Sequence, residues 1–112
     1  MTIEHLTVQR GGGSLDGGGI RSQADLTVRD ARLRWNSAGG AGKGGGIYHA
    51  VSRFTGRDLT LLRTRVEDNS ANLGGGVHTD NGKVVVTNSS ISWNNASVGG
   101  GGLFVAAISG VT

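Results

Sequence analysis

Gly44-Gly45-Gly46-Ile47 is one of four copies of a short motif, three glycines followed by an aliphatic residue, that decides the fold of this chain. The other copies are Gly17–Ile20, Gly74–Val77 and Gly100–Leu103, so that successive aliphatic residues are 27, 30 and 26 positions apart. A regular period of this length is typical of a solenoid, in which each repeat is one coil stacked on the next. The motif therefore predicts a repeat architecture, although it says little about chemistry.

A second block keeps the same register between the copies of the glycine motif. Leu59–Ala71 reads LTLLRTRVEDNSA and aligns without gaps with Leu26–Ala38 and with Val84–Ala96. Apolar residues alternate within the block, and the alternation changes phase at Leu62 and Arg63. This pattern predicts two short strands joined by a corner, and the glycine motif predicts a third strand entered by a tight turn.

Three strands per coil describe an all-β chain, a right-handed parallel β-helix of about three full coils with partial coils at its ends. The coils are expected at about 1–20 (partial), 20–46, 47–76, 77–102 and 103–112 (partial). Helical spacing of apolar residues is absent, and the 22 glycines disfavour helices. Amphipathic caps are not evident, so we expect 1–112 to be one uncapped segment of a longer β-helix domain.

The repeat also predicts which residues stack inside the coils. The inward columns are expected to be Ile20, Ile47, Val77 and Leu103; Val28, Leu61 and Val86; and Leu33, Val66 and Ile91. Asn36, Asn69 and Asn94 share a further column and are expected to form a ladder of stacked amides with a structural role. Replacement of Asn69, the middle rung, is expected to cost about 1 to 3 kcal/mol.

Composition narrows the classes of function. The chain contains no cysteine, which excludes disulfides and thiolate metal sites, and it has neither an apolar run long enough for a membrane span nor a basic-then-apolar signal segment. The net charge is +3, but many basic residues have acids in the next coil, such as Asp30 beside Arg63 and Arg34 beside Glu67. We therefore expect no nucleic-acid partner, no direct insertion into a membrane and no cofactor.

The columns that follow the glycine motif are expected to lie on the surface. The first contains Arg21, Tyr48, His78 and Phe104, the second Ser22, His49, Thr79 and Val105, and the third Gln23, Ala50, Asp80 and Ala106. Asp80 is the one carboxylate among them, whereas a glycoside hydrolase needs two. A metal cluster of His49, His78 and Asp80 is an alternative without regular spacing. A solvated surface is the favoured interpretation of this face.

The best candidate for binding is an irregularity of length. Successive blocks start 25, 33 and 25 residues apart, and most of the excess falls in an excursion over Tyr48–Asp58. Insertions in solenoids become loops on one face, which often bind ligands, although a neutral loop is the alternative. A glycan would stack on aromatic rings of this excursion, and an acidic polymer or host-surface ligand would pair with its arginines. The candidate binding residues are Tyr48, His49, Arg53, Phe54 and Arg57.

The motifs resemble a known family of repeats. Gly-Gly-Ala-aliphatic and Phe-x-x-Asn motifs characterise polymorphic outer-membrane-protein repeats and related autotransporter and adhesin passengers of the pectin-lyase-like superfamily. This chain has Gly44–Ile47 in the first role, with glycine in place of alanine. In the second role it has Leu33–Asn36, Val66–Asn69 and Ile91–Asn94, with an aliphatic residue in place of phenylalanine.

The resemblance implies a secreted or outer-membrane location in bacteria. The function it implies is structural or adhesive, in a passenger or stalk segment without catalysis of its own. The alternative is a fragment of a polysaccharide-active lyase or hydrolase, because such enzymes share the β-helix fold.

Overall fold

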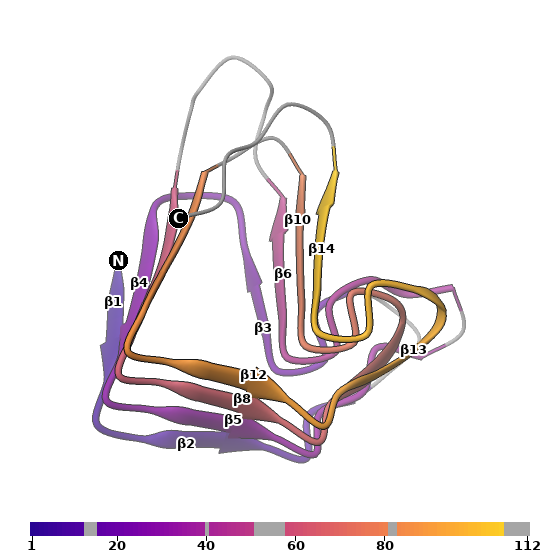
Figure 1. Cartoon of the computed structure of the whole chain (residues 1–112), viewed down its shortest axis with the longest axis horizontal. Coiled ribbons are helices and arrows are strands. Elements are labelled where there is room, and N and C mark those ends of the chain that lie inside the picture. Colours follow the sequence, from indigo (N-terminus) through magenta and orange to yellow (C-terminus); the bar gives the residue numbers. More distant parts are fainter. Residues whose placement is uncertain (13–15, 40, 51–57, 81–82, 107–112) are drawn as a thin grey trace.

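The chain winds into a parallel β-solenoid of about 3 turns (Figure 1). A computed structural model describes residues 1–12, 16–39, 41–50, 58–80 and 83–106. Its strands form three four-stranded sheets and one two-stranded sheet, and every pairing is parallel. The all-β prediction and the predicted β-helix are therefore confirmed.

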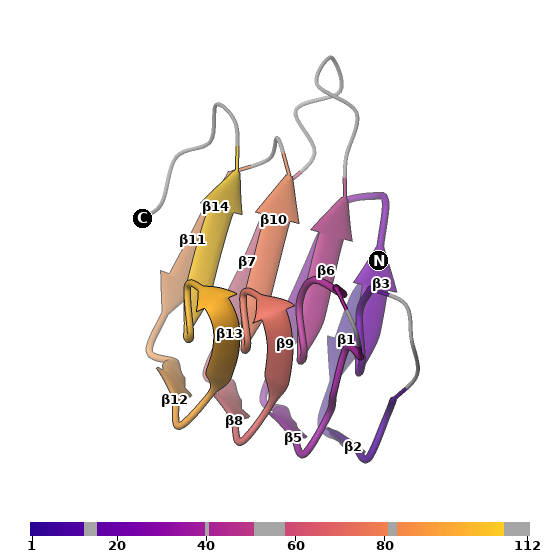
Figure 2. The ribbon, with the colours of Figure 1, turned by 90° about the vertical axis from the view of Figure 1, so that its right-hand side faces the viewer.

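Each of the three long sheets forms one side of the coil. Sheet 1 contains β1 (Thr2–Glu4), β4 (Leu26–Arg29), β7 (Leu59–Leu62) and β11 (Val84–Thr87). Sheet 2 contains β2 (Thr7–Gln9), β5 (Arg32–Arg34), β8 (Arg65–Glu67) and β12 (Ser90–Ser92). Sheet 3 contains β3 (Ile20–Ser22), β6 (Ile47–Ala50), β10 (Val77–Asp80) and β14 (Leu103–Ala106). Figure 2 shows successive coils of sheet 3 side by side.

The apolar columns stack as the repeat predicts. In sheet 2, Leu33 pairs with Val66 and Val66 with Ile91. Leu33 and Val66 are fully buried, while Ile91 in the last coil is partly buried against them. The columns that begin with Ile20 and Val28 keep the same register. Burial of these alternate residues provides the main free energy of folding, because each coil covers the apolar face of the next.

Two of the corners in each coil are made by residues other than glycine. The corner between sheets 1 and 2 and the corner that follows sheet 2 hold residues with φ between 46° and 60°. The first corner column contains His5, Asp30, Arg63 and Asn88, and the second contains Arg10, Trp35, Asp68 and Trp93. A left-handed conformation is uncommon for such residues, so the neighbouring coils must impose it.

The glycine motif provides the turn into sheet 3. Gly44 has a φ of 69°, which glycine adopts without steric cost. Two residues later, a Cβ on Gly46 would lie only 2.6 Å from the carbonyl oxygen of Gly76 in the next coil. Glycine is therefore required at Gly46 by the close approach of two backbones.

An amide ladder connects the coils just after the second corner. Asn36 Nδ2 donates to Asn69 Oδ1 at 3.0 Å, and Asn69 Nδ2 donates to Asn94 Oδ1 at 2.9 Å. The same amides also donate to main-chain carbonyls of the preceding strands, Asn36 to Val8 and Asn69 to Leu33. Each rung therefore links side chain to side chain and side chain to backbone.

Two details differ from the expectations. A fourth, two-stranded sheet of β9 (Ser70–Leu73) and β13 (Asn95–Gly99) forms an arm beside sheet 3, where no strand was predicted (Figures 1 and 2). Arg34 and Glu67 are register partners, as predicted, but their side chains do not form an ion pair, because the Glu67 carboxylate lies 3.5 Å from Arg32 instead. The predicted pair of Asp30 and Arg63 is confirmed, with hydrogen bonds of 2.6 and 3.0 Å.

Candidate functional site

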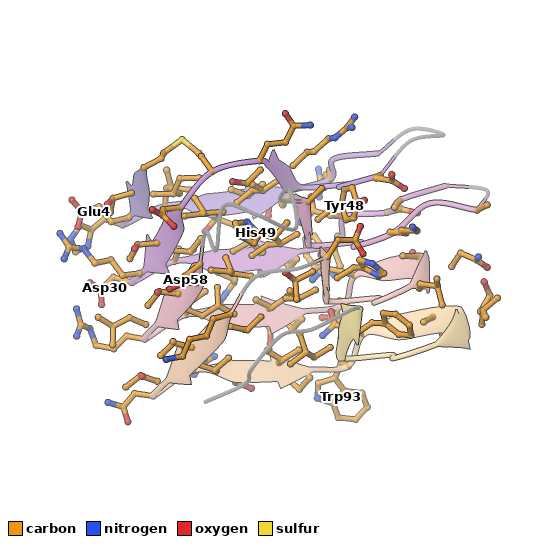
Figure 3. All side chains as sticks on the ribbon, turned by 90° about the horizontal axis from the view of Figure 1, so that it is seen from above. Glu4, Asp30, Tyr48, His49, Asp58 and Trp93 are labelled. Atoms are coloured by element: carbon orange, nitrogen blue, oxygen red, sulfur yellow. The ribbon has the colours of Figure 1, made fainter. Side chains whose placement is uncertain are left out.

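The candidate binding residues on β6 point to opposite sides of sheet 3. Tyr48 faces outward, whereas His49 follows the inward parity of Ile47 and its side chain is fully buried. Figure 3 shows the two side chains on opposite sides of the strand. The expectation that His49 belongs to an exposed column is therefore wrong, and the same holds for its column mates Ser22 and Thr79, which are 4% and 0% exposed.

Three of the predicted binding residues are outside the part of the chain that the structure describes. Arg53, Phe54 and Arg57 lie in 51–57, outside the described residues. Tyr48, at the start of the excursion, is only 7% exposed. A ring that is nearly covered offers little area for stacking, so the described part of the excursion does not present an aromatic platform.

Tyr48 instead takes part in a polar cluster on the outer face of sheet 3. Its hydroxyl donates to Asp80 Oδ2 at 2.6 Å, and His78 Nε2 lies 2.9 Å from Asp80 Oδ1. Burial alone would raise the pKa of Asp80, but the hydrogen bonds from Tyr48 and His78 outweigh burial and hold it below its usual value. Burial, followed by the bond to Asp80, raises the pKa of Tyr48 above its usual range.

Aromatic contacts close this cluster. The His78 ring stacks on Phe104 with centroids 4.9 Å apart and planes 10° apart, and it meets Tyr48 at 5.4 Å in a tilted geometry. His78 is only 1% exposed. A general acid or base must reach the proton it transfers, and this imidazole has no room for a substrate. The cluster therefore acts as a polar and aromatic contact across β6, β10 and β14.

The same geometry rules out the proposed metal cluster. His78 and Asp80 lie on the outer face of sheet 3, whereas His49 lies on the inner face, so the sheet separates them. Among the residues that the structure describes, no group of three His, Cys, Asp or Glu side chains is placed to hold a metal ion.

A second surface, which the sequence did not mark as a candidate site, carries two exposed aromatic residues. Trp35 and Trp93 occupy the corner after sheet 2 and are 47% and 83% exposed. The guanidinium carbons of Arg34 and Arg10 lie 4.4 and 5.6 Å from the centre of the Trp35 ring. We call these two tryptophans and Arg34 the tryptophan corner; Figure 3 shows Trp93 projecting away from the ribbon.

A hollow lies at the other end of sheet 2, against the corner with sheet 1. It has a volume of about 510 Å³, and three of its eight lining residues are arginines. The lining residues are His5, Leu6, Thr7, Asp30, Ala31, Arg32, Arg63 and Arg65. We call this the arginine hollow. The tryptophan corner and the arginine hollow thus lie at opposite ends of one face, the outer face of sheet 2.

The arginines near this hollow differ in their partners. Arg63 is paired with Asp30, and Arg29 donates to Glu4 at 2.6 Å. These guanidinium groups hold the pKa values of both carboxyls below their usual range. The exposed Arg65 has neither an ion pair nor a side-chain hydrogen bond within the described ranges. Arg65 therefore offers the hollow a cation whose donors are unused.

Comparisons with models of protein families, with curated proteins and with solved structures find no match to this chain. The described residues also contain no helical segment with the length and apolarity that a membrane span requires. The structure thus shows the fold, while the resemblance to outer-membrane-protein repeats rests on the motif residues alone.

Proposed function

We propose that this chain is a structural and adhesive segment of a secreted or surface-displayed bacterial β-helix protein, with no catalysis of its own. The observation that carries the proposal is that Tyr48, His78 and Asp80 form hydrogen bonds with one another and leave no room for a substrate. These residue types are capable of acid and base chemistry, but here they bond to one another across neighbouring coils. Sheet 3 thus uses its reactive groups to connect coils.

The stacking of the coils supports a scaffold. Successive coils are joined by the ladder of Asn36, Asn69 and Asn94. Ion pairs such as Asp30 with Arg63 join them at the corner between sheets 1 and 2. A solenoid built in this way presents side chains at intervals of about 4.8 Å along an extended surface. Such a surface suits multivalent contact with a repetitive ligand. The resemblance to autotransporter and adhesin passengers supports export and surface display.

The alternative, a fragment of a polysaccharide-active enzyme, fits the geometry less well. A hydrolase needs two carboxyl groups that flank the scissile bond. On the described outer face of sheet 3, Asp80 is the one carboxylate and both of its oxygens are engaged. The enzymatic reading therefore depends on residues that this face does not provide.

The proposal is tested with the purified segment coupled to beads. Beads that carry the segment should be retained on surfaces coated with glycans or with host cells, and beads that carry an unrelated β-helix of similar charge should not. Incubation with a panel of soluble polysaccharides should release neither reducing ends nor unsaturated products. Release of either product would favour the enzymatic alternative, and absence of retention on every surface would contradict adhesion.

A further inference from the structure

The two tryptophans occupy a corner where both rings keep much of their surface in solvent. Trp35 and Trp93 have φ values of 55° and 56°, a conformation that bulky residues rarely adopt. Trp93 is 83% exposed, so its indole buries little apolar area. Large exposed aromatic side chains are typical of recognition surfaces, because they give contact area at a low cost in conformational entropy. Packing within the chain thus does not account for the Trp93 ring, whereas the half-exposed Trp35 ring is contacted by Arg34 and Arg10.

The spacing of the rings suits an extended ligand. Main-chain hydrogen bonds connect Trp35 to Asp68 and Asp68 to Trp93, at 2.9 and 3.1 Å, so the three residues occupy successive coils. Two coil steps place the tryptophan backbones about 10 Å apart along the solenoid axis. This distance is comparable to the length of a disaccharide, and sugar rings stack with their apolar faces on aromatic side chains. A polysaccharide running along the axis can therefore meet both indoles.

Charge on the outer face of sheet 2 indicates the sign of the ligand. Arg32 and Arg65 are register partners on adjacent strands, and like charges placed side by side are unfavourable unless an anion compensates them. Glu67 lies 3.5 Å from Arg32, while Arg65 in the arginine hollow has no carboxylate partner among the residues described. At the other end of the face, Arg34 lies 4.4 Å from the centre of the Trp35 ring.

We propose that the outer face of sheet 2 binds an anionic polysaccharide. Sugar rings stack on Trp35 and Trp93, and Arg65 binds a carboxylate or sulfate of the chain in the arginine hollow. The site rests on the proposed adhesive function, since it names the ligand class for adhesion. Carboxylated and sulfated glycans share this chemistry, because arginine binds both anions through paired N–H groups. Asp68 lies between the two tryptophans and repels anions at this corner, so the anionic groups of the ligand bind in the arginine hollow and the sugar rings lie on the indoles.

Intrinsic fluorescence reports directly on this site, because the only two tryptophans of the chain are Trp35 and Trp93. The intact chain is titrated with polygalacturonate, dextran sulfate, neutral dextran and single-stranded DNA. We expect a saturable change in emission with at least one of the two anionic polysaccharides, and the comparison of these two separates carboxylate from sulfate recognition. Binding should weaken as salt is added. Neutral dextran and DNA should cause little change.

Two charge variants separate the site from general electrostatic attraction. Arg65→Gln should weaken binding at least about tenfold, because it removes charge-assisted contacts in the hollow. The matched control is Arg21→Gln, which removes an equal charge from an exposed arginine on sheet 3 and should change affinity less than about twofold. Both variants keep both tryptophans, so the same fluorescence assay applies to each.

Trp93→Ala tests the stacking platform by affinity electrophoresis in gels that contain the polysaccharide. The exposed indole contributes little to stability, so the thermal melt should stay close to that of the parent chain while retardation in the gel is lost.

The proposal is overturned if neither anionic polysaccharide changes the emission. It is also overturned if Arg21→Gln weakens binding as much as Arg65→Gln, or if DNA binds as tightly as the polysaccharides. Bead retention on other surfaces, together with no binding of either anionic polysaccharide, would refute this site and leave the adhesive function standing. Binding in solution without any bead retention would do the reverse.

Discussion

Replacement of Asn69 by alanine should cost more stability than truncation of any other side-chain amide among the described residues. The Asn69 side chain makes four hydrogen bonds. Its Oδ1 accepts from the backbone N–H and the Nδ2 of Asn36, both at 3.0 Å. Its Nδ2 donates to the carbonyl of Leu33 at 3.0 Å and to Asn94 Oδ1 at 2.9 Å. Asn36 and Asn69 are each 1% exposed, so water does not replace the lost partners.

The size of the effect follows from these contacts. A typical hydrogen bond contributes about 0.5–1.5 kcal/mol net, and a buried donor left without a partner costs about 1–3 kcal/mol. Asn69→Ala leaves the backbone N–H of Asn36 in that state, although Asn36 Nδ2 keeps its bond to Val8. We therefore expect a loss of about 2–4 kcal/mol in the free energy of unfolding. Because domains of this size are stable by about 5–15 kcal/mol, the loss is a large fraction of the total.

The assay is urea unfolding followed by far-ultraviolet circular dichroism, with the midpoint and slope fitted separately. The matched control is Asn95→Ala, which removes an exposed amide from β13 and should change stability by less than about 0.5 kcal/mol. The ladder argument fails if the free energy of unfolding of Asn69→Ala stays within about 0.5 kcal/mol of that of the parent chain, since so small an effect would mean that water replaces the lost hydrogen bonds. Equal losses in the two variants would also contradict it, because burial would then make no difference.

Three further changes test other contacts. Gly46→Ala should lower stability by at least about 2 kcal/mol in urea, because its Cβ would lie 2.6 Å from the Gly76 carbonyl; a neutral effect would show that the coils can separate. Thr64→Val should cost about 1 kcal/mol in the same assay, since the single proton of the buried hydroxyl is shared between two carbonyl oxygens at 3.0 and 3.1 Å, and an unchanged midpoint would contradict this. The pKa of Asp80 is lower in the folded chain than in the unfolded chain. Its contribution to folding stability is therefore present above about pH 4 and is lost as the pH falls through the pKa of the folded chain. Acid titration of the thermal midpoint should show this loss in the parent and a smaller one in Asp80→Asn, and identical profiles would contradict it.

The interior of the coil was predictable because a solenoid fixes its neighbours by period. Once Leu33, Val66 and Ile91 align in sequence, each must lie one strand away from the next, and the structure places them so. No long-range topology has to be guessed, since each coil contacts only its neighbours. The glycine motif is informative for a related reason. A Cβ at Gly46 would collide with the backbone of the next coil, so the presence of glycine there indicates that two backbones lie close together.

Two features escaped prediction for physical reasons. The arm formed by β9 and β13 has little apolar alternation, and its register shifts between Ala96 and Gly99, so backbone pairing rather than side-chain burial defines it. Arg34 and Glu67 are register partners but form no ion pair, because a column fixes Cα positions and does not fix the direction of a long side chain. Arg34 turns instead toward the ring of Trp35.

The exposure of the columns that follow the glycine motif was predicted least well, and the error has an identifiable origin. Ile47 faces the core, so strand parity sends His49 inward as well, and the period-two rule applied to the glycine motif would have revealed this. The tryptophan corner gave a weaker signal. Trp35 and Trp93 directly precede Asn36 and Asn94, but sequence alone does not indicate that tryptophan adopts a left-handed conformation there.

The second corner shows where recognition can vary without disturbing the fold. Its column holds Arg10, Trp35, Asp68 and Trp93, four positions that share one backbone conformation but carry cationic, aromatic and acidic side chains. The conformation therefore does not depend on the residue at the corner. It is imposed where the chain turns into the amide ladder, which is built from asparagine at each described rung from Asn36 onward. Because the ladder fixes the backbone, the side chain at the corner can vary without disturbing the fold. We therefore expect substitutions in this column to alter ligand specificity with little loss of stability.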